Sequence, residues 1–176
     1  VNEDLEGVEG DGIPNPGIYF HLCVYKARPD INSIVHTHPP FSSALAMTGR
    51  ELAVAHMDVA MFYNDCAYLA EWPGMPLADE EGRLISEALS DKHSLLLANH
   101  GILTTGNSIE KATFLAIQFE RASRLQLLAE RVGPIKPIKH KDAQEAHDFQ
   151  LAEGIVKGNF NSWASQLLRE QPDVKS

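Results

Sequence analysis

The sequence has only two cysteines, Cys23 and Cys66, among its 176 residues. Two cysteines are too few for the disulfide framework of a small secreted protein, so we expect two reduced thiols. No apolar run approaches the roughly 20 residues that a helix needs to cross a bilayer. No signal peptide is recognisable either, although the chain begins at Val1 rather than at a methionine. These absences predict a cytoplasmic protein with no membrane partner.

Basic charge is also scarce. The 15 Lys and Arg residues are outnumbered by 24 Asp and Glu, which gives a formal net charge of −9. No basic run is long enough to follow a phosphate backbone, which argues against nucleic acid as a partner. A hydrophobic content of 44% and a charged content of 22% are ordinary for a globular protein. We therefore expect one domain over residues 1–176 with a sizeable core.

Hydrophobic periodicity predicts alternating helices and strands. The expected helices cover about 16–29, 41–49, 78–91, 107–133 and 141–156, with a weaker pattern at 160–169. Strands are expected at 31–38, 94–99 and 101–106, with strands or irregular segments near 52–56 and 66–70. At the start of the longest helix, Asn107 and Glu110 match a variant of the capping box. The alternation predicts an α/β fold, with residues 134–176 as a C-terminal helical extension.

Three histidines stand at the ends of two expected strands. His36 and His38 occur in SIVHTHPP, and His100 occurs in LLLANHGILTTG. Side chains at i and i+2 of a strand share one face, so His36 and His38 can reach one ion. His100 can complete the set from a neighbouring strand end, where Gly101 lets backbone and ligand come close. A single histidine in an apolar run is more often a packed core residue than a ligand. The position of these three at strand ends is what favours a metal site.

The type of ligand atom limits which metals the site can bind. Three neutral imidazoles with an open position are typical of catalytic zinc, and imidazole also suits iron, copper and nickel. The sequence therefore predicts one divalent metal ion with a face open to substrate.

Taken together, these segments resemble the class II aldolase/adducin family. The similarity is carried by a helix followed by ARPD, the strand ending in HTH, the LLLANHGILTTG segment and the long helix beginning NSIEKA, over about residues 13–132. The resemblance implies a three-layer α/β/α sandwich around a largely antiparallel central sheet, and often a homotetramer with sites between subunits. It also implies that His36, His38 and His100 bind the metal, most often zinc, with iron, manganese or cobalt as alternatives.

The chain departs from the family's enzymes at three places. Aldolases and epimerases carry a Glu or Asp at the start of the first helix, and counting back from His36 places that position at Gly17. The family's phosphate-binding segments lie upstream of Val1 in a typical member, so we expect this chain to lack the family's N-terminal part. No tyrosine follows Tyr68 to act as the C-terminal proton donor of several members. Nothing in the sequence therefore argues for a sugar-phosphate substrate.

Other side chains are candidates for moving a proton. His56 and Asp58 stand near the position where the epimerases carry His-Ala-Asp, and on an extended segment they would face the same way. Tyr63 is a further candidate near the site, as is His21, one helical turn past Gly17. For each of these, a packing or hydrogen-bonding role is the alternative. The remaining histidines outside the site, His93, His140 and His147, are expected to be solvated.

These observations favour a metal-dependent lyase. A metal held by three imidazoles can act as a Lewis acid and stabilise an enolate, the anion through which aldol cleavage and decarboxylation both run. We expect a small carbonyl or carboxylate substrate, with His56 or Asp58 moving the proton. Decarboxylation leaves an electron pair without a base, so it tolerates Gly17. Two alternatives stay open: a mononuclear non-haem iron(II) oxygenase, which the imidazoles suit, and a non-catalytic adducin-like scaffold, which Gly17 favours.

Overall fold

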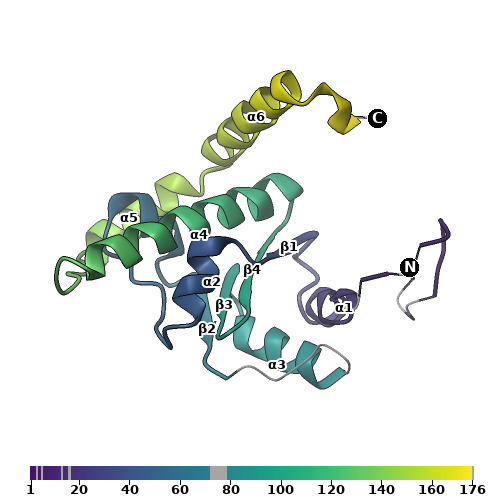
Figure 1. Cartoon of the computed structure of the whole chain (residues 1–176), viewed down its shortest axis with the longest axis horizontal. Coiled ribbons are helices and arrows are strands. Elements are labelled where there is room, and N and C mark those ends of the chain that lie inside the picture. Colours follow the sequence, from purple (N-terminus) through teal and green to yellow (C-terminus); the bar gives the residue numbers. More distant parts are fainter. Residues whose placement is uncertain (3, 5, 13, 16, 72–78, 176) are drawn as a thin grey trace.

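A four-stranded sheet lies at the centre of the computed structural model, which describes residues 1–175 except 3, 5, 13, 16 and 72–78 (Figure 1). Its strands are β1 (Ser33–Thr37), β2 (Cys66–Leu69), β3 (Ser94–Leu97) and β4 (Gly101–Gly106), in the order β1-β4-β3-β2. β4 runs antiparallel to both β1 and β3, and β2 runs parallel to β3. The prediction of a largely antiparallel sheet is therefore confirmed.

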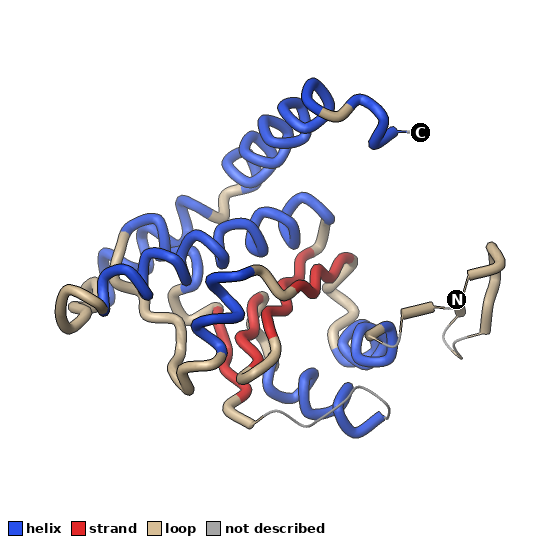
Figure 2. The backbone as a smooth tube through the Cα atoms, in the orientation of Figure 1, coloured by secondary structure: helices blue, strands red, loops and turns tan. Residues whose placement is uncertain are grey.

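Helices cover both faces of this sheet (Figure 2). On one face, α1 (Ile18–Ala27) packs against α3 (Asp79–Leu89). On the other face lie α2 (Pro40–Ala46) and α4 (Ile109–Glu130). α6 (Glu153–Glu170) and the short 3₁₀ helix η1 (Met57–Phe62) pack against α4, α5 (His140–Gln150) packs against η1, and the 3₁₀ helix η2 (Pro172–Lys175) packs against α6. This arrangement is the expected α/β/α sandwich. Among the described helices, none combines the length and the hydropathy that a membrane span requires.

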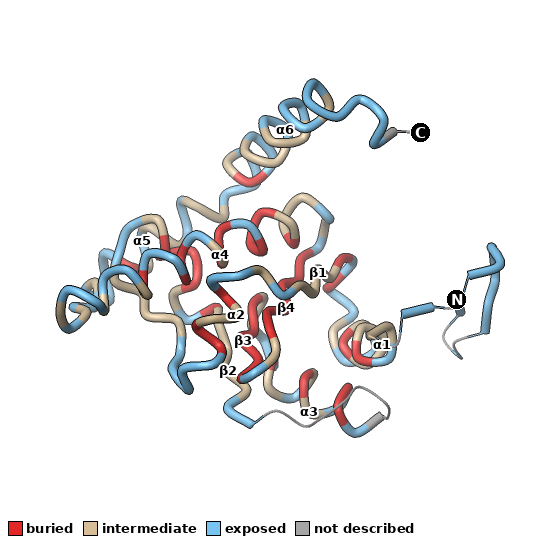
Figure 3. Tube along the Cα trace, viewed as in Figure 1, coloured by how far each residue is buried: buried red, intermediate tan, exposed pale blue. Residues whose placement is uncertain are grey.

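The core consists of two layers that meet at the sheet. Every residue of β3 and β4 is buried, which explains why their sequences are continuous apolar runs rather than alternating ones (Figure 3). Leu95, Leu97 and Leu103 pack on the α1 and α3 side, whereas Leu96 and Ile102 pack on the α2 and α4 side. Sheet residues two apart thus contact the same helical layer, and this parity decides which face each histidine occupies.

Two details of the helix boundaries differ from the predictions. The cap of α4 is Ser108 rather than Asn107, because the Ser108 hydroxyl accepts a hydrogen bond from the Lys111 backbone amide at 3.3 Å. Glu110 is then the second helical residue and cannot close a capping box. The expected starts of the helices near Pro16 and residue 78 lie outside the described residues.

The single helix expected over 141–156 is wrong. α5 ends at Gln150, and α6 begins at Glu153 and continues through the segment where only a weak helix was expected. Leu151 in the break and Trp163 of α6 both pack against the core cluster that α4 shares. The turn at 151–152 therefore lets two differently directed helices place apolar side chains on the same core, which sequence periodicity alone does not reveal.

Candidate metal centre

The first two histidines are positioned by the end of β1. His36 pairs with Leu103 of β4 in the sheet register and lies two residues beyond Ile34, so it faces the α1 layer. Its ring meets the ring of Phe20 edge-on, with centroids 4.9 Å apart. His38 lies just past the strand, where Pro39 and Pro40 stop the ladder and start α2. Both rings thus project from the same end of the same edge strand.

The third histidine sits in the hairpin between β3 and β4. Asn99 in this three-residue turn adopts the left-handed conformation with φ 55°, which its short polar side chain tolerates. The His100 amide donates to the Leu97 carbonyl at 3.1 Å and closes the turn. Gly101 follows at once, and a Cβ on it would lie 2.5 Å from His38 Cδ2 and 2.7 Å from the Thr37 carbonyl oxygen. Only glycine therefore lets the hairpin approach β1 this closely.

The structure brings the three imidazoles together. Ring centroids are 4.8 Å apart for His36 and His38, 4.9 Å for His36 and His100, and 4.7 Å for His38 and His100. One ligand nitrogen from each ring lies within 4.8 Å of the other two. The Nε2 atoms of His36 and His38 face each other at 3.0 Å. Three nitrogens at this separation can share one cation.

Hydrogen bonding and burial keep these rings in the form that binds a cation. His36 Nδ1 donates to the Ile102 carbonyl at 2.9 Å, which fixes the tautomer and leaves the Nε2 lone pair free. Burial, together with the nearby His100 and His38, lowers the pKa of His36 to about 3. Burial and His38 also lower the pKa of His100. Both imidazoles are thus neutral near pH 7, so no proton has to leave before a metal binds.

The residues present fit a divalent metal. His100 Nδ1 is buried and has no hydrogen-bond partner within the described part of the chain. A buried polar nitrogen without a partner is costly, and a role at a metal would give this ring a compensating interaction. Three imidazole nitrogen donors suit zinc, iron or cobalt rather than calcium or magnesium, which prefer oxygen ligands.

Glu120 of α4 supports this site from outside. The N-cap of α2 is Pro39, which offers no side-chain hydrogen bond. Glu120 replaces that cap, because its carboxylate accepts from the backbone amides of Phe41 at 2.9 Å and Ser42 at 2.8 Å. It also accepts from the Ser42 hydroxyl at 2.8 Å. A carboxylate at a helix N-terminus is favourable, and this one fixes the turn that carries His38.

We expect Glu120→Ala to lower the free energy of unfolding by about 1–2 kcal/mol, as the loss of a helix cap does. Metal affinity should fall by about tenfold or more, because the support of a ligand is lost. Glu120→Gln, whose amide oxygen still accepts, should lose less of both. Urea unfolding and zinc titration measure the two effects. Equal metal affinity in Glu120→Ala and the unaltered protein would show that Glu120 does not position His38.

The structure places His56 and Asp58 differently from the prediction. They are not on one extended segment: His56 is the extended N-cap of η1, and Asp58 lies inside that 3₁₀ helix. His56 Nδ1 accepts from the Asp58 amide at 3.1 Å, and the two side chains approach only to 4.0 Å. The chain turns at His56 instead of staying extended, because the His56 ring accepts this backbone hydrogen bond and caps η1. His56 also lines a pocket beside Leu125 and Gln126 of α4.

Tyr63 hydrogen-bonds to His140 of α5 and lines a polar pocket with Lys111 and Leu151. None of the contacts found among the described residues joins His56, Asp58 or Tyr63 to the three histidines. Within one chain, the proton-moving candidates and the imidazole cluster are thus separate groups.

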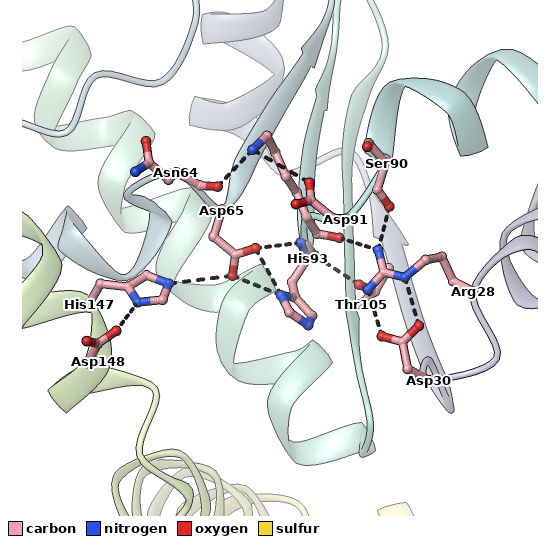
Figure 4. A network of polar contacts seen from close by, with 11 residues as sticks. Arg28, Asp30, Asn64, Asp65, Ser90, Asp91, His93, Thr105, His147 and Asp148 are labelled. Atoms are coloured by element: carbon pink, nitrogen blue, oxygen red, sulfur yellow. Dashed lines mark hydrogen bonds and ion pairs between the residues drawn. The ribbon is translucent and has the colours of Figure 1, made fainter.

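Two histidines expected to be solvated, His93 and His147, are instead partly buried and belong to a hydrogen-bonded network around Asp65 (Figure 4). Asp65, only 8% exposed, accepts from the His93 amide at 2.8 Å and from His93 Nδ1 at 2.9 Å. His147 Nδ1 hydrogen-bonds to Asp148 at 2.9 Å, and His147 Nε2 lies 3.8 Å from Asp65. This network joins the starts of β2 and β3 to α5, at the opposite end of β3 from His100. It holds the fold together away from the metal centre.

A pocket of about 250 Å³ opens beside His36 and is lined by Asn15, Gly17, Ile18, Phe20, His21 and His36. Gly17 is the N-cap of α1 and lines this pocket with His36, so the position at which the resemblance implies a catalytic carboxylate lies beside one of the three histidines. The sequence could suggest this only by counting back from His36 through the helix.

Comparisons with known proteins agree with this geometry. The family model described as Class II Aldolase and Adducin N-terminal domain matches residues 1–127. The chain belongs to the class II aldolase/adducin family. A solved L-fuculose 1-phosphate aldolase from Glaciozyma antarctica PI12 superposes with a TM-score of 0.87 at 29% identity, covering 98% of this chain and 68% of that one.

Two curated members of the class II aldolase/adducin family match almost the whole chain. Decarboxylase NovR of Streptomyces niveus is 29% identical over 174 residues, 98% of this chain and 64% of the relative. A 4-hydroxy-3-prenylphenylpyruvate oxygenase/4-hydroxy-3-prenylbenzoate synthase of Streptomyces roseochromogenus subsp. oscitans is 28% identical over 174 residues, 98% of this chain and 62% of the relative. The chain thus spans less than two thirds of the length of these two relatives.

Proposed function

We propose that the chain carries the metal centre of a lyase that cleaves a carbon–carbon bond next to a carbonyl group. Of the two reactions of this kind, decarboxylation of a keto or hydroxy acid is favoured over aldol cleavage. The observation that carries the proposal is the meeting of three imidazoles, one with a buried nitrogen that lacks a hydrogen-bond partner among the described residues. A divalent metal, zinc before iron, manganese or cobalt, would supply Lewis-acid polarisation of a substrate oxygen when bound.

Gly17 supports decarboxylation. Loss of carbon dioxide leaves its electron pair on the substrate carbon, so no base has to remove a proton first. Aldol chemistry does need a base, and Gly17 places no side chain beside His36. One of the curated relatives described above, NovR, is named a decarboxylase, which supports this choice.

The chain's own residues bind and orient in this scheme. The Ile102 carbonyl orients the His36 ring by accepting its hydrogen bond. The turn capped by Glu120 positions His38, and the β3–β4 hairpin positions His100. Among the described residues lining the pocket beside His36, His21 is a further imidazole that can hydrogen-bond to a substrate oxygen and orient it.

We also propose that copies of the chain associate, most simply as a homotetramer, and that His56, Asp58 and Tyr63 serve a neighbouring copy's site. Exposed apolar side chains on α4 support association, since Leu125 is 40% and Leu128 is 49% exposed. His56 lines a pocket with Leu125, so it would lie at such a contact.

An iron(II) oxygenase is the second candidate function. It is supported by the name of one relative, which includes an oxygenase activity, and by the affinity of imidazole for iron. A pure scaffold is disfavoured, because it has no use for three converging imidazoles.

One experiment separates these possibilities. The protein is purified without oxygen, its metals are measured, and keto acids are supplied while carbon dioxide release and oxygen uptake are followed. We expect about one metal per chain and metal-dependent carbon dioxide release without oxygen uptake. Stoichiometric oxygen uptake with iron would favour the oxygenase, and the absence of any bound metal or turnover would favour the scaffold.

A further inference from the structure

The composition of the pocket beside His36 indicates what kind of group it binds, namely the part of a substrate away from its reacting end at the three histidines. Its floor is Phe20, which is 1% exposed, and Ile18 adds a second apolar side chain. The described lining contains no Asp, Glu, Lys or Arg side chain, and its polar side chains are limited to Asn15 and the imidazoles of His21 and His36.

Gly17 is what leaves this volume open. The Asn15 side chain accepts from the Gly17 amide at 2.8 Å, which fixes the direction in which a side chain at residue 17 would project. A Cβ there would lie 3.2 Å from Asn15 Oδ1 and 3.2 Å from Phe20 Cε1. A carboxylate at residue 17 would thus occupy space beside the Phe20 ring. With glycine, the same space is available to a ligand.

The size fits an aromatic ring. An apolar cavity of about 150 Å³ is known to hold benzene, and this pocket measures about 250 Å³. His36 forms one wall of the pocket. A substrate whose reacting end lies at the three histidines could therefore place the rest of its structure in this pocket. Apolar pockets with few polar groups are the usual form of small-molecule sites.

We propose that this pocket binds an uncharged apolar group of about phenyl size, attached to the carboxylate or carbonyl end that is held at the three histidines. The proposal rests on the proposed function for its reacting end, and it names the substrate class as keto acids with an apolar side chain. A phosphorylated substrate would find no Lys or Arg side chain among the described residues that line this pocket.

The test uses the full zinc-loaded chain and two carboxylates, phenylacetate and acetate, which differ by the ring. Binding is followed by shifts of the backbone amide resonances of Ile18, Phe20, His21 and His36. We expect phenylacetate to bind at least about tenfold more tightly than acetate, because even one methylene in an apolar pocket is worth about tenfold.

Gly17→Leu should remove at least about tenfold of that preference by filling the pocket. Gly12→Leu is the matched control, since a Cβ at Gly12 meets nothing within 4 Å. It should leave the preference within about twofold. Equal affinity for the two carboxylates, or equal effects of the two substitutions, would overturn the proposal.

Turnover of two β-keto acids, acetoacetate and benzoylacetate, separates this proposal from the proposed function, because loss of carbon dioxide from either one leaves an enolate. If phenylacetate is preferred but neither keto acid loses carbon dioxide, the apolar pocket stands and the lyase assignment fails. If both keto acids react with equal kcat/KM and phenylacetate binds no better than acetate, the lyase assignment stands and the pocket proposal fails.

Discussion

Replacing His36 with alanine should lower metal affinity by more than the roughly 10–100-fold typical of changes to residues that only support a ligand. Its ring contacts both other imidazoles, and its Nδ1 is already held by the Ile102 carbonyl. No other side chain can take its place from the same strand position. Activity should fall in proportion to metal content, and zinc titration with parallel turnover assays measures both.

His147→Ala is the control for this substitution, because His147 is also a hydrogen-bonded, partly buried histidine but belongs to the Asp65 network. We expect it to keep the metal stoichiometry of the unaltered protein. If His36→Ala also retained full metal occupancy, the imidazole cluster would not be the binding site. The same result for a His36 and His100 double variant would remove the assignment altogether.

Gly101→Ala should have the second largest effect. The new Cβ would lie 2.5 Å from His38 Cδ2 and 2.7 Å from the Thr37 carbonyl oxygen, both closer than real Cβ contacts come. His38 or the β1–β4 pairing has to shift, and overpacking of this kind costs about 1–3 kcal/mol of unfolding free energy. Because His38 moves, metal affinity should fall by about 10–100-fold. Thermal unfolding and zinc titration measure the two losses.

Gly133→Ala is the matched control, since a Cβ there meets nothing within 4 Å. It should leave both metal affinity and stability within the small range typical of surface substitutions, about 0.5 kcal/mol. A Gly101→Ala variant that binds zinc as tightly as Gly133→Ala would show that the close approach of the hairpin to His38 is not needed.

Much of the fold could be predicted because its signals are local. The apolar runs of β3 and β4 and the glycine that follows His100 and begins β4 determine where the hairpin turns. The spacing of His36 and His38 on one strand was enough to place them on one side. These features depend on residues a few positions apart, which periodicity and turn chemistry capture.

What could not be predicted depends on partners distant in sequence. Glu120 caps α2 by accepting from the Phe41 amide 79 positions earlier, and Asp65 meets His93 across 28 positions. The break at Leu151 follows from its packing on α4, not from a glycine or proline. Likewise, the Asp58 amide donates a hydrogen bond to the His56 ring, and the segment forms a 3₁₀ helix where an extended segment was expected. Such contacts override local preference only once the chain is folded.

The most direct measurement of the central claim is anomalous X-ray scattering from crystals grown with zinc. A single strong peak should lie about 2.0–2.1 Å from one nitrogen each of His36, His38 and His100, with part of the coordination sphere open toward the pocket beside His36. A zinc-loaded crystal without a peak between these three rings, or with zinc held elsewhere on the chain, would contradict the account.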